Sequence, residues 1–466
     1  MSGFRSWRPL ALLVGLVAAL SLVLVACTSD DDDDAEAPAA TPTTAPATAT
    51  AAPAAATATA APATATATPT PEATEEPEPV GEQLRIGFLA DFSGPLAEFG
   101  PVIQTGVDLA IAHINAVGGV NGQDVILVTG DTRVDPTQGV EEARRLIEVE
   151  GVHAIVGPLS STVTLAVAES VASGAGIPVI SPSATSPALS VADDDGFLFR
   201  STTSDAAQGV VLAGLADNQG FDNVAVLYRD DAYGQGLSDA FVGAFTTRFG
   251  GTATAVAYSA DGQISYLAEL QQAAGEGATV LVAVAFPDEA LVFIREAIEN
   301  DIFNAFLFVD GTKSQDLIDG IGADYLNGMF GTAPGAGPET PALSAWNASY
   351  TAEYGELPTL PFVREAYDAT IAIALAAEAA GSTDGADIRD QLPRIGAPDG
   401  NIATPGINSL LSAMATLREG GDINYQGAAT SLDWNEVGDV TSGYIEVWQY
   451  AEGAIASVTE VPFDLE

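Results

Sequence analysis

Two short runs of small and hydroxyl-bearing residues, 157–162 and 180–187, carry the clearest binding chemistry of this chain. Each run follows a short apolar stretch, 153–156 in the first case and 177–180 in the second, and a stretch suited to a helix, 163–172, lies between them. This order predicts that both runs lie at the carboxyl ends of parallel strands, where open α/β sheets bind ligands. Hydroxyls and free backbone N–H groups at a helix start can hold an anionic group without an arginine or lysine.

The charge balance excludes several classes of partner. The 466 residues include 15 basic and 63 acidic side chains, which gives a net charge of −48. Nucleic acid is therefore not an expected partner, because phosphate binding needs a basic surface, and the folded part should not bind an anionic lipid surface. A surface with Lys313 as its only lysine suits a saline habitat, or simply favours solubility. The apolar share, 47%, is enough for two well-packed lobes.

The sequence offers no catalytic or cofactor motif. His113 and His153 are the only histidines, and neither lies near a cysteine or a Gly-x-Ser-x-Gly turn. No His/Cys cluster has the spacing of metal ligands, and no glycine-rich loop ends in Gly-Lys-Ser/Thr. We therefore expect a protein that is not an enzyme, with no catalytic residues, no metal and no cofactor.

The amino terminus has the pattern of an export signal. Arg5 and Arg8 precede an apolar stretch, 10–25, which is too short for a stable membrane-spanning helix. The stretch ends in Leu-Val-Ala-Cys at 24–27, which resembles a bacterial lipobox, and Cys27 is the only cysteine of the chain. We expect residues 1–27 to be a lipoprotein signal peptide with lipidation at Cys27; an ordinary signal peptide with a chance cysteine is the alternative.

An Ala/Thr/Pro-rich segment, 28–82, follows the cysteine and contains acidic runs near both ends. It has no large apolar side chains to bury, so it cannot offset the entropy of ordering. Frequent proline should keep it extended. We expect a disordered linker that acts as a spacer.

The remainder of the chain alternates short β-branched runs with longer amphipathic stretches, which predicts parallel sheets covered by helices on both faces. The expected strands are 84–89, 125–129, 153–156, 178–180, 224–228, 252–258, 280–285, 305–309 and, as the final one, 443–450. The expected helices are 101–117, 138–149, 163–172, 206–219, 235–248, 266–274, 288–300, 340–354 and 363–380. Glycine and proline at 331–338 indicate a break between lobes.

A series of motifs in fixed order extends this pattern. Besides the two hydroxyl-rich runs, they are Ile-Gly-Phe at 86–88, Ser-Gly-Pro-Leu-Ala at 93–97 with Phe-Gly at 99–100, 114–122, 231–236 and Val-Asp-Gly at 309–311. From about residue 84 onward the chain resembles the extracytoplasmic solute-binding proteins of the branched-chain amino acid (Leu/Ile/Val-binding) type, which serve ABC importers.

The resemblance implies the type I periplasmic-binding-protein fold, an α/β architecture of two Rossmann-like lobes with parallel sheets joined by three hinge crossovers. The crossovers would fall near 200–204, 331–334 and 441–444. Lobe 1 would then comprise 83–203 and 333–442, and lobe 2 would comprise 204–332 and 443–466. The stretch 399–426 is longer than in compact relatives.

Four residues of the hydroxyl-rich runs are candidates for a ligand carboxylate. Ser161 and Thr185 would donate through their hydroxyls, with Ser183 and Ala184 adding backbone groups. The first position is open by one residue, because Ser160 and Thr162 are chemically similar to Ser161. A plain helix cap is the other reading of Ser161.

Two residues of the expected second lobe are candidates for the rest of the ligand. Asp310 ends an apolar strand, and the resemblance implies that it meets a ligand ammonium; a structural ion pair with Lys313 is the alternative. Tyr233 corresponds to the family tyrosine that closes over the ligand, or is simply a turn aromatic.

Three phenylalanines correspond to family positions that wall the side-chain pocket: Phe99, Phe286 and Phe362. Each could equally belong to the core. Their apolar character favours an apolar ligand side chain.

The resulting hypothesis is a monomeric lipoprotein on the outer face of the bacterial cytoplasmic membrane or in the periplasm. It would capture a small zwitterionic solute, foremost a branched-chain or other aliphatic amino acid, for ABC permease subunits. One alternative is a receptor of the same type for an amide, urea or an aromatic acid. Another is a ligand-sensing module for a signalling partner.

Overall fold

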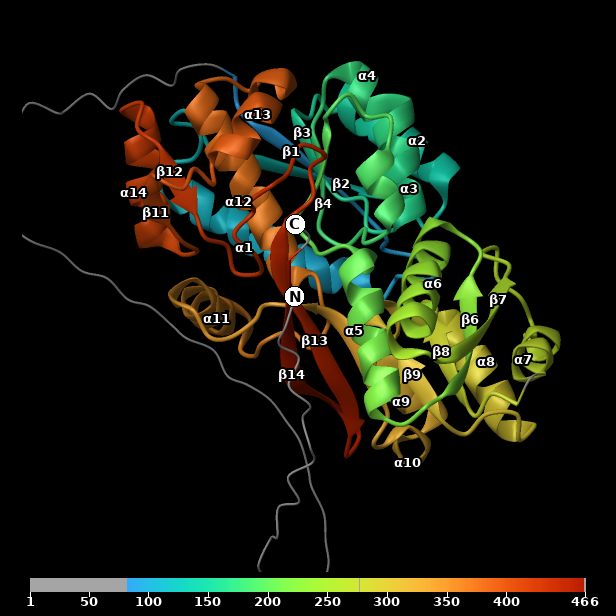
Figure 1. Ribbon diagram of the computed structural model, residues 1–466. Helices are drawn as coiled ribbons and strands as arrows, with labels where there is room; N and C mark the ends of the chain where they lie inside the picture. The colour runs from blue at the N-terminus through green and yellow to red at the C-terminus, as the bar shows by residue number, and fades with distance from the viewer. Residues whose placement is uncertain (1–81, 276, 465–466) are drawn as a thin grey trace, which may run out of the picture. The chain divides into compact units, whose positions relative to one another are not determined.

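The computed structural model describes residues 82–275 and 277–464, all within one compact unit, Thr74–Glu466. The expected signal peptide, Cys27 and nearly all of the expected linker lie outside the described residues. Two large sheets, each with its own helices, make up the unit (Figure 1). We call the part around the first sheet lobe 1 and the part around the second sheet lobe 2.

Lobe 1 contains a five-stranded parallel sheet in the order β2-β1-β3-β4-β5. Its strands are β1 (Arg85–Ala90), β2 (Ile126–Asp131), β3 (Ala154–Val156), β4 (Val179–Ser181) and β5 (Leu198–Arg200). The first helices are α1 (Phe99–Ala116), α2 (Pro136–Arg144), α3 (Ser161–Val167) and α4 (Ser173–Ala175). A later segment adds α11 (Pro341–Tyr354), α12 (Val363–Ala380), α13 (Gly385–Gln391), α14 (Ile407–Arg418), β11 (Asn401–Ala403) and β12 (Ile423–Tyr425). The α12 helix packs along α1 and α13, and α2 packs on α3.

Lobe 2 contains a seven-stranded sheet in the order β14-β13-β10-β9-β8-β6-β7. Its strands are β6 (Asn223–Arg229), β7 (Thr252–Tyr258), β8 (Val280–Val284), β9 (Phe306–Phe308), β10 (Phe330–Gly335), β13 (Ser442–Ala451) and β14 (Ala454–Asp464). Its helices are α5 (Asp205–Asn218), α6 (Ala232–Ala244), α7 (Leu267–Ala274), α8 (Pro287–Glu299), α9 (Gln315–Ile321) and α10 (Ala323–Leu326).

Burial on both faces explains why the central strands could be predicted. Along β6, Val224 and Val226 belong to one apolar cluster, whereas Ala225 and Leu227 belong to another on the opposite face. The α5 and α6 helices pack together on one side, and α7 and α8 contact each other on the other. Strands buried in this way read as continuous apolar runs. All nine predicted helices and all nine predicted strands are present with small shifts at their ends.

The chain passes between the sheets three times: between β5 and α5, after β10, and before β13. The α/β architecture with two lobes joined by three crossovers is thus as expected. The second passage follows Gly335, because β10 pairs with β9 and β13 in the lobe 2 sheet. The glycine at 331, taken as a sign of the break, lies inside this strand. A Cβ atom on Gly331 would lie 2.3 Å from Trp448 Cζ2, so the glycine makes room for the indole.

The strand at 443–450 is not the last one, and the lobe 2 sheet is not wholly parallel. β13 runs antiparallel to β10 and turns back into β14, an edge strand. Glu452 and Gly453 both have positive φ, 52° and 81°, as in the two-residue hairpin turns that suit twisted strands. Most side chains of β14 are exposed or only half-buried, so no apolar run marked the strand.

The stretch 399–426 folds as β11, α14 and β12, and β11 pairs with β12 in parallel. The α14 helix packs on α12 and α1. Its last residue, Arg418, forms an ion pair with Glu378 of α12 at 2.5 Å. Among the described residues, no helix has both the length and the hydropathy to cross a membrane.

Candidate functional site

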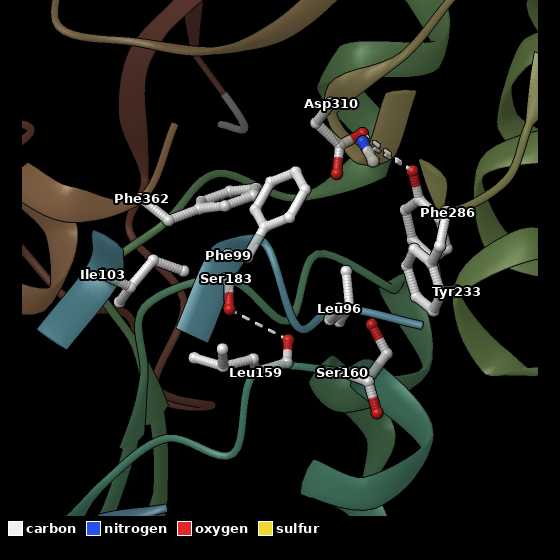
Figure 2. A pocket seen from close by; sticks show the side chains of 12 residues that line it. Leu96, Phe99, Ile103, Leu159, Ser160, Ser183, Tyr233, Phe286, Asp310 and Phe362 are labelled. Atoms are coloured by element: carbon white, nitrogen blue, oxygen red, sulfur yellow. Dashed lines mark hydrogen bonds between the residues drawn. The ribbon is translucent and has the colours of Figure 1, made fainter. Parts of the chain in front are cut away.

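A cavity lies between the two lobes and contains most of the predicted site residues (Figure 2). Its space, including the opening to solvent, is ≈ 340 Å³. The lining residues are Leu96, Phe99, Ile103, Leu159, Ser160, Ser161, Ser183, Tyr233, Phe286, Asp310, Gly311 and Phe362. The chain therefore brings residues of both lobes to one place.

The start of α3 supplies hydroxyls to the lobe 1 side of the cavity. Ser160 is the helix cap, since its hydroxyl accepts from the backbone N–H of Val163 at 3.3 Å. Ser161 is therefore not the cap; it is the first helical residue, and its Oγ accepts from the Ser186 N–H at 3.2 Å. Ser183 donates to the Leu159 carbonyl at 2.9 Å. All three serines line the cavity, so the alternative at position 160 also has structural support.

Two predicted residues of this loop lie behind the lining. Ala184 is fully buried and donates its N–H to Ser181 Oγ at 3.0 Å. Thr185 donates its hydroxyl to Asp205 Oδ2 at 2.9 Å, and its carbonyl accepts from Arg200. The strand-and-loop pattern predicted the neighbourhood of these residues but not which way each side chain points.

Asp310 forms the lobe 2 end of the cavity and directly follows Val309 at the end of β9. Its Oδ1 accepts from Gln208 Nε2 at 2.7 Å. The same atom accepts from the Tyr233 hydroxyl at 3.0 Å (Figure 2). Burial raises the pKa of Asp310 to about 6, and these two hydrogen bonds only partly oppose the shift. Lys313 pairs with Glu446 instead, so the alternative of an Asp310–Lys313 pair is wrong.

A second carboxyl lies close to Asp310 and was not predicted. Asp205 is the first residue of α5, one turn before Gln208, and is fully buried. Burial raises the pKa of Asp205 well above its usual range, and the neighbouring Asp310 charge raises it further. Among the described residues, Asp205 Oδ1 and Gln208 Oε1 have no hydrogen-bond partner. Asp205 could not be recognised as a site residue from the sequence, because an acidic residue after Ser204 is typical of an ordinary helix start.

Aromatic side chains form the walls between these two ends. Tyr233 and Phe286 stack with ring centroids 5.3 Å apart and an interplanar angle of 8°. Phe99 and Phe362 form the facing wall (Figure 2). Phe362 precedes α12 with φ of 76°, a left-handed backbone conformation. All three predicted phenylalanines thus line the cavity, as does Tyr233.

The cavity combines three chemical environments. Neutral hydroxyls lie on the lobe 1 side, the buried carboxyl of Asp310 lies on the lobe 2 side, and apolar side chains lie between them; Asp205 is close to Asp310 but outside the lining. The described residues include no cluster of three or more His, Cys, Asp or Glu placed to hold a metal ion. A cavity of this kind between two hinged α/β lobes defines a two-lobed solute-binding protein.

Comparison with known proteins specifies the family. The family model described as periplasmic binding protein matches residues 83–411. The chemotactic signal transduction system substrate-binding protein BasB of Halobacterium salinarum is 27% identical over 389 residues, covering 78% of this chain and 86% of that protein. The Leu/Ile/Val-binding protein homolog 3 of Brucella melitensis is 27% identical over 378 residues, covering 80% and 93%.

A solved structure agrees with the fold. The branched-chain amino acid transporter substrate-binding protein LivJ of Streptococcus pneumoniae, in complex with isoleucine, has a TM-score of 0.64 at 23% identity. The match covers 82% of this chain and 100% of that one. This chain belongs to the periplasmic binding protein family and has the type I fold. It is a substrate-binding protein of the Leu/Ile/Val-binding type, not an enzyme.

Proposed function

We propose that this protein captures a small zwitterionic amino acid with an aliphatic, foremost branched, side chain and delivers it to the permease subunits of an ABC importer. The observation that carries the proposal is the opposite chemistry at the two ends of one cavity, neutral hydroxyls at Ser161 and Ser183 and a buried carboxyl at Asp310, which has Asp205 close to it. The names of the relatives and the isoleucine bound to LivJ support this choice of solute.

The ligand carboxylate would lie at the start of α3. The hydroxyl of Ser161 and backbone N–H groups at the amino end of the helix are neutral donors whose partial charges favour an anion, whereas the Ser183 hydroxyl already donates to the Leu159 carbonyl. Their neutrality means that no buried cation is left without a partner when the cavity is empty.

The ligand ammonium would lie against the Asp310 carboxyl at the other end. It would donate to Asp310 and to the two acceptor atoms without partners, Asp205 Oδ1 and Gln208 Oε1. An ammonium has three donors, which matches these three acceptors. An aliphatic side chain would then contact Phe99, Phe362 and their neighbours, which offer it no polar side-chain group.

The position of the receptor at the membrane is a further part of the proposal. Lipidation at Cys27 and a spacer over 28–82 would hold the binding unit at the outer face of the cytoplasmic membrane as a monomer. Cys27→Ser should abolish labelling of the expressed full chain by a fatty-acid analogue, because the thioether needs the thiol. Labelling of the variant at the wild-type level would contradict the lipid anchor.

A thermal-shift screen tests the solute class. A ligand that binds only the native state stabilises it by about 2.7 kcal/mol at a hundred times its Kd. We expect leucine, isoleucine or valine to raise the melting temperature, and acetamide, urea and p-hydroxybenzoate to leave it unchanged. A shift with an amide or an aromatic acid alone would favour the alternative receptor for those solutes.

The relative from Halobacterium, named as part of a chemotactic system, favours a second candidate function, which is ligand sensing. Transport and sensing use the same binding step, so the discriminating measurement is made on cells. Deletion of the gene should abolish uptake of the radiolabelled amino acid if the protein serves an importer. Normal uptake together with a lost behavioural response to the same amino acid would favour sensing.

A further inference from the structure

Hydrogen bonds join the two lobes on both flanks of the cavity, and the residues that form them adjoin the cavity-lining residues. On one flank Thr162, next to Ser161, contacts Ala232, next to Tyr233. On the other flank Glu98, next to Phe99, contacts Ser314. Neither contact includes a cavity-lining side chain.

The first flank binds the amino end of α6 to lobe 1. Ala232 is the first residue of α6, so its N–H has no acceptor within the helix. Thr162 Oγ1 accepts from this N–H at 3.0 Å, and Ser186 Oγ donates to the Ala232 carbonyl at 2.6 Å. Both polar groups of this peptide unit thus bond to lobe 1 hydroxyls.

On the second flank, too, a side chain of lobe 1 bonds to the amino end of a lobe 2 helix. Glu98 Oε2 accepts from the Ser314 hydroxyl at 2.5 Å, at the amino end of α9. Burial raises the pKa of Glu98, and the backbone N–H groups of Gln315 and Asp316 partly oppose that shift by hydrogen bonding. A carboxylate of lobe 1 therefore satisfies groups at a helix start of lobe 2.

A glycine sets how closely the lobes approach on the first flank. A Cβ atom on Gly236 of α6 would lie 2.8 Å from Ser186 Oγ and 2.8 Å from Pro187 Cδ, both in lobe 1. Gly243 lies in the same helix, and a Cβ atom there would meet nothing within 4 Å. The two glycines share their helical setting and differ in the lobe contact.

We propose that these two flanking contacts form a closure seam, made by Thr162, Ser186 and Gly236 on one side and by Glu98 and Ser314 on the other, which sets ligand affinity without touching the ligand. The seam rests on the proposed function, because it acts on capture of the same solute. Each contact joins chain segments that carry opposite walls of the cavity, so breaking one separates the walls. The seam residues are positioning residues, and their loss should raise the dissociation rate of the ligand.

The decisive comparison is Gly236→Ala against Gly243→Ala in the full chain. Alanine is the better helix former, so Gly243→Ala should not lower the melting temperature of the ligand-free protein, and Gly236→Ala should still unfold in one cooperative transition. Stopped-flow measurements with leucine should show dissociation at least about tenfold faster from Gly236→Ala, because the new methyl group holds the lobes apart. Gly243→Ala should release leucine at the wild-type rate. Equal rates for Gly236→Ala and wild type would overturn the proposal.

Two substitutions test the hydrogen bonds themselves. Thr162→Val keeps the shape and removes the acceptor, so dissociation should be about threefold to tenfold faster. Glu98→Gln keeps an acceptor oxygen and should stay within about threefold of wild type, whereas Glu98→Leu should release leucine about tenfold faster. Unchanged release from both Thr162→Val and Glu98→Leu would refute the seam.

A scattering measurement separates failure of the seam from failure of the proposed function. Without any added solute, Gly236→Ala should have a larger radius of gyration than Gly243→Ala, whatever the true ligand is. If wild type binds none of the amino acids but this difference is found, the solute assignment falls and the seam stands. If wild type binds leucine and both variants match it in scattering and in rate, the seam falls and the function stands.

Discussion

The two ends of the cavity differ in the means by which they would bind the opposite charges of a zwitterion. The lobe 1 end has neutral serines, Ser161 at the start of α3 and Ser183 after β4, and these already bond to Ser186 and Leu159 within the protein. The lobe 2 end has the carboxyl of Asp310, with Asp205 close to it, and burial is unfavourable for the charged form of both. The neutral end therefore leaves no charge unpaired without a ligand, whereas the charged end gains most from one.

The largest effect should come from Asp310→Asn. The amide keeps an acceptor for Gln208 and Tyr233 but removes the charge that would pair with an ammonium. An unpaired buried charge costs roughly 3–5 kcal/mol, so calorimetry should show leucine binding weaker by about a hundredfold or more. The melting temperature of the ligand-free variant should not fall, because a buried carboxyl has been made neutral. Normal binding, or a collapsed fold, would make Asp310 structural and remove the contrast between the two ends.

A pH titration should give the next largest effect and should distinguish the two ends in wild type. The ligand-free pKa of Asp310 is raised to about 6, and a neighbouring ammonium would lower it. Affinity for leucine should therefore be constant above neutral pH and fall by about tenfold per unit as pH drops below 6.

Stability of the ligand-free protein should change in the opposite direction. Asp310 binds its proton more tightly in the folded state than in the unfolded state, so stability rises as pH falls from about 7 toward the ordinary aspartate value of 3.8.

In Asp310→Asn the fall in affinity for leucine below pH 6 should largely disappear. An affinity that rises on acidification would contradict an ionised Asp310 in the complex.

The smallest effects should come from the neutral end, where Ser160 and Ser161 form a matched pair. Ser161→Ala should weaken leucine binding by about threefold to tenfold and leave ligand-free stability almost unchanged. Ser160→Ala removes the α3 cap and should lower stability by about 1 kcal/mol, seen in denaturant unfolding. A hundredfold loss of leucine affinity in Ser161→Ala would show that the neutral end contributes as much to binding as the charged end.

Burial decided which parts of the fold the sequence could predict. β6 and β8 are buried on both faces and have continuous apolar runs, so their positions were clear. β10 contains Gly331 and Pro334, which indicate a loop when read locally, although the glycine is there to admit Trp448. The need for a glycine at 331 arises from Trp448, more than a hundred positions away in the sequence. The residues around Gly331 therefore give no sign of it.

The candidate site shows the same division. The hydroxyl-rich loops and Asp310 stand at strand ends, so their approach to one another followed from the topology. Thr185 and Asp205 lie close together in the fold, yet one was expected at the ligand and the other was not recognised. Neither side chain lines the cavity, and their pairing depends on how β4 and α5 pack rather than on residue type.

The left-handed backbone at Phe362 limits how the pocket can change in evolution or by design. Residues with a branched β-carbon are strongly disfavoured at positive φ, so valine, isoleucine and threonine are poor replacements there, whereas glycine and asparagine fit. Phe99 begins a regular helix and carries no such restriction. The pocket can therefore be adapted to larger or smaller solutes most readily by substitutions at Phe99. At position 362 the backbone favours residues without a branched β-carbon, such as phenylalanine, asparagine or glycine.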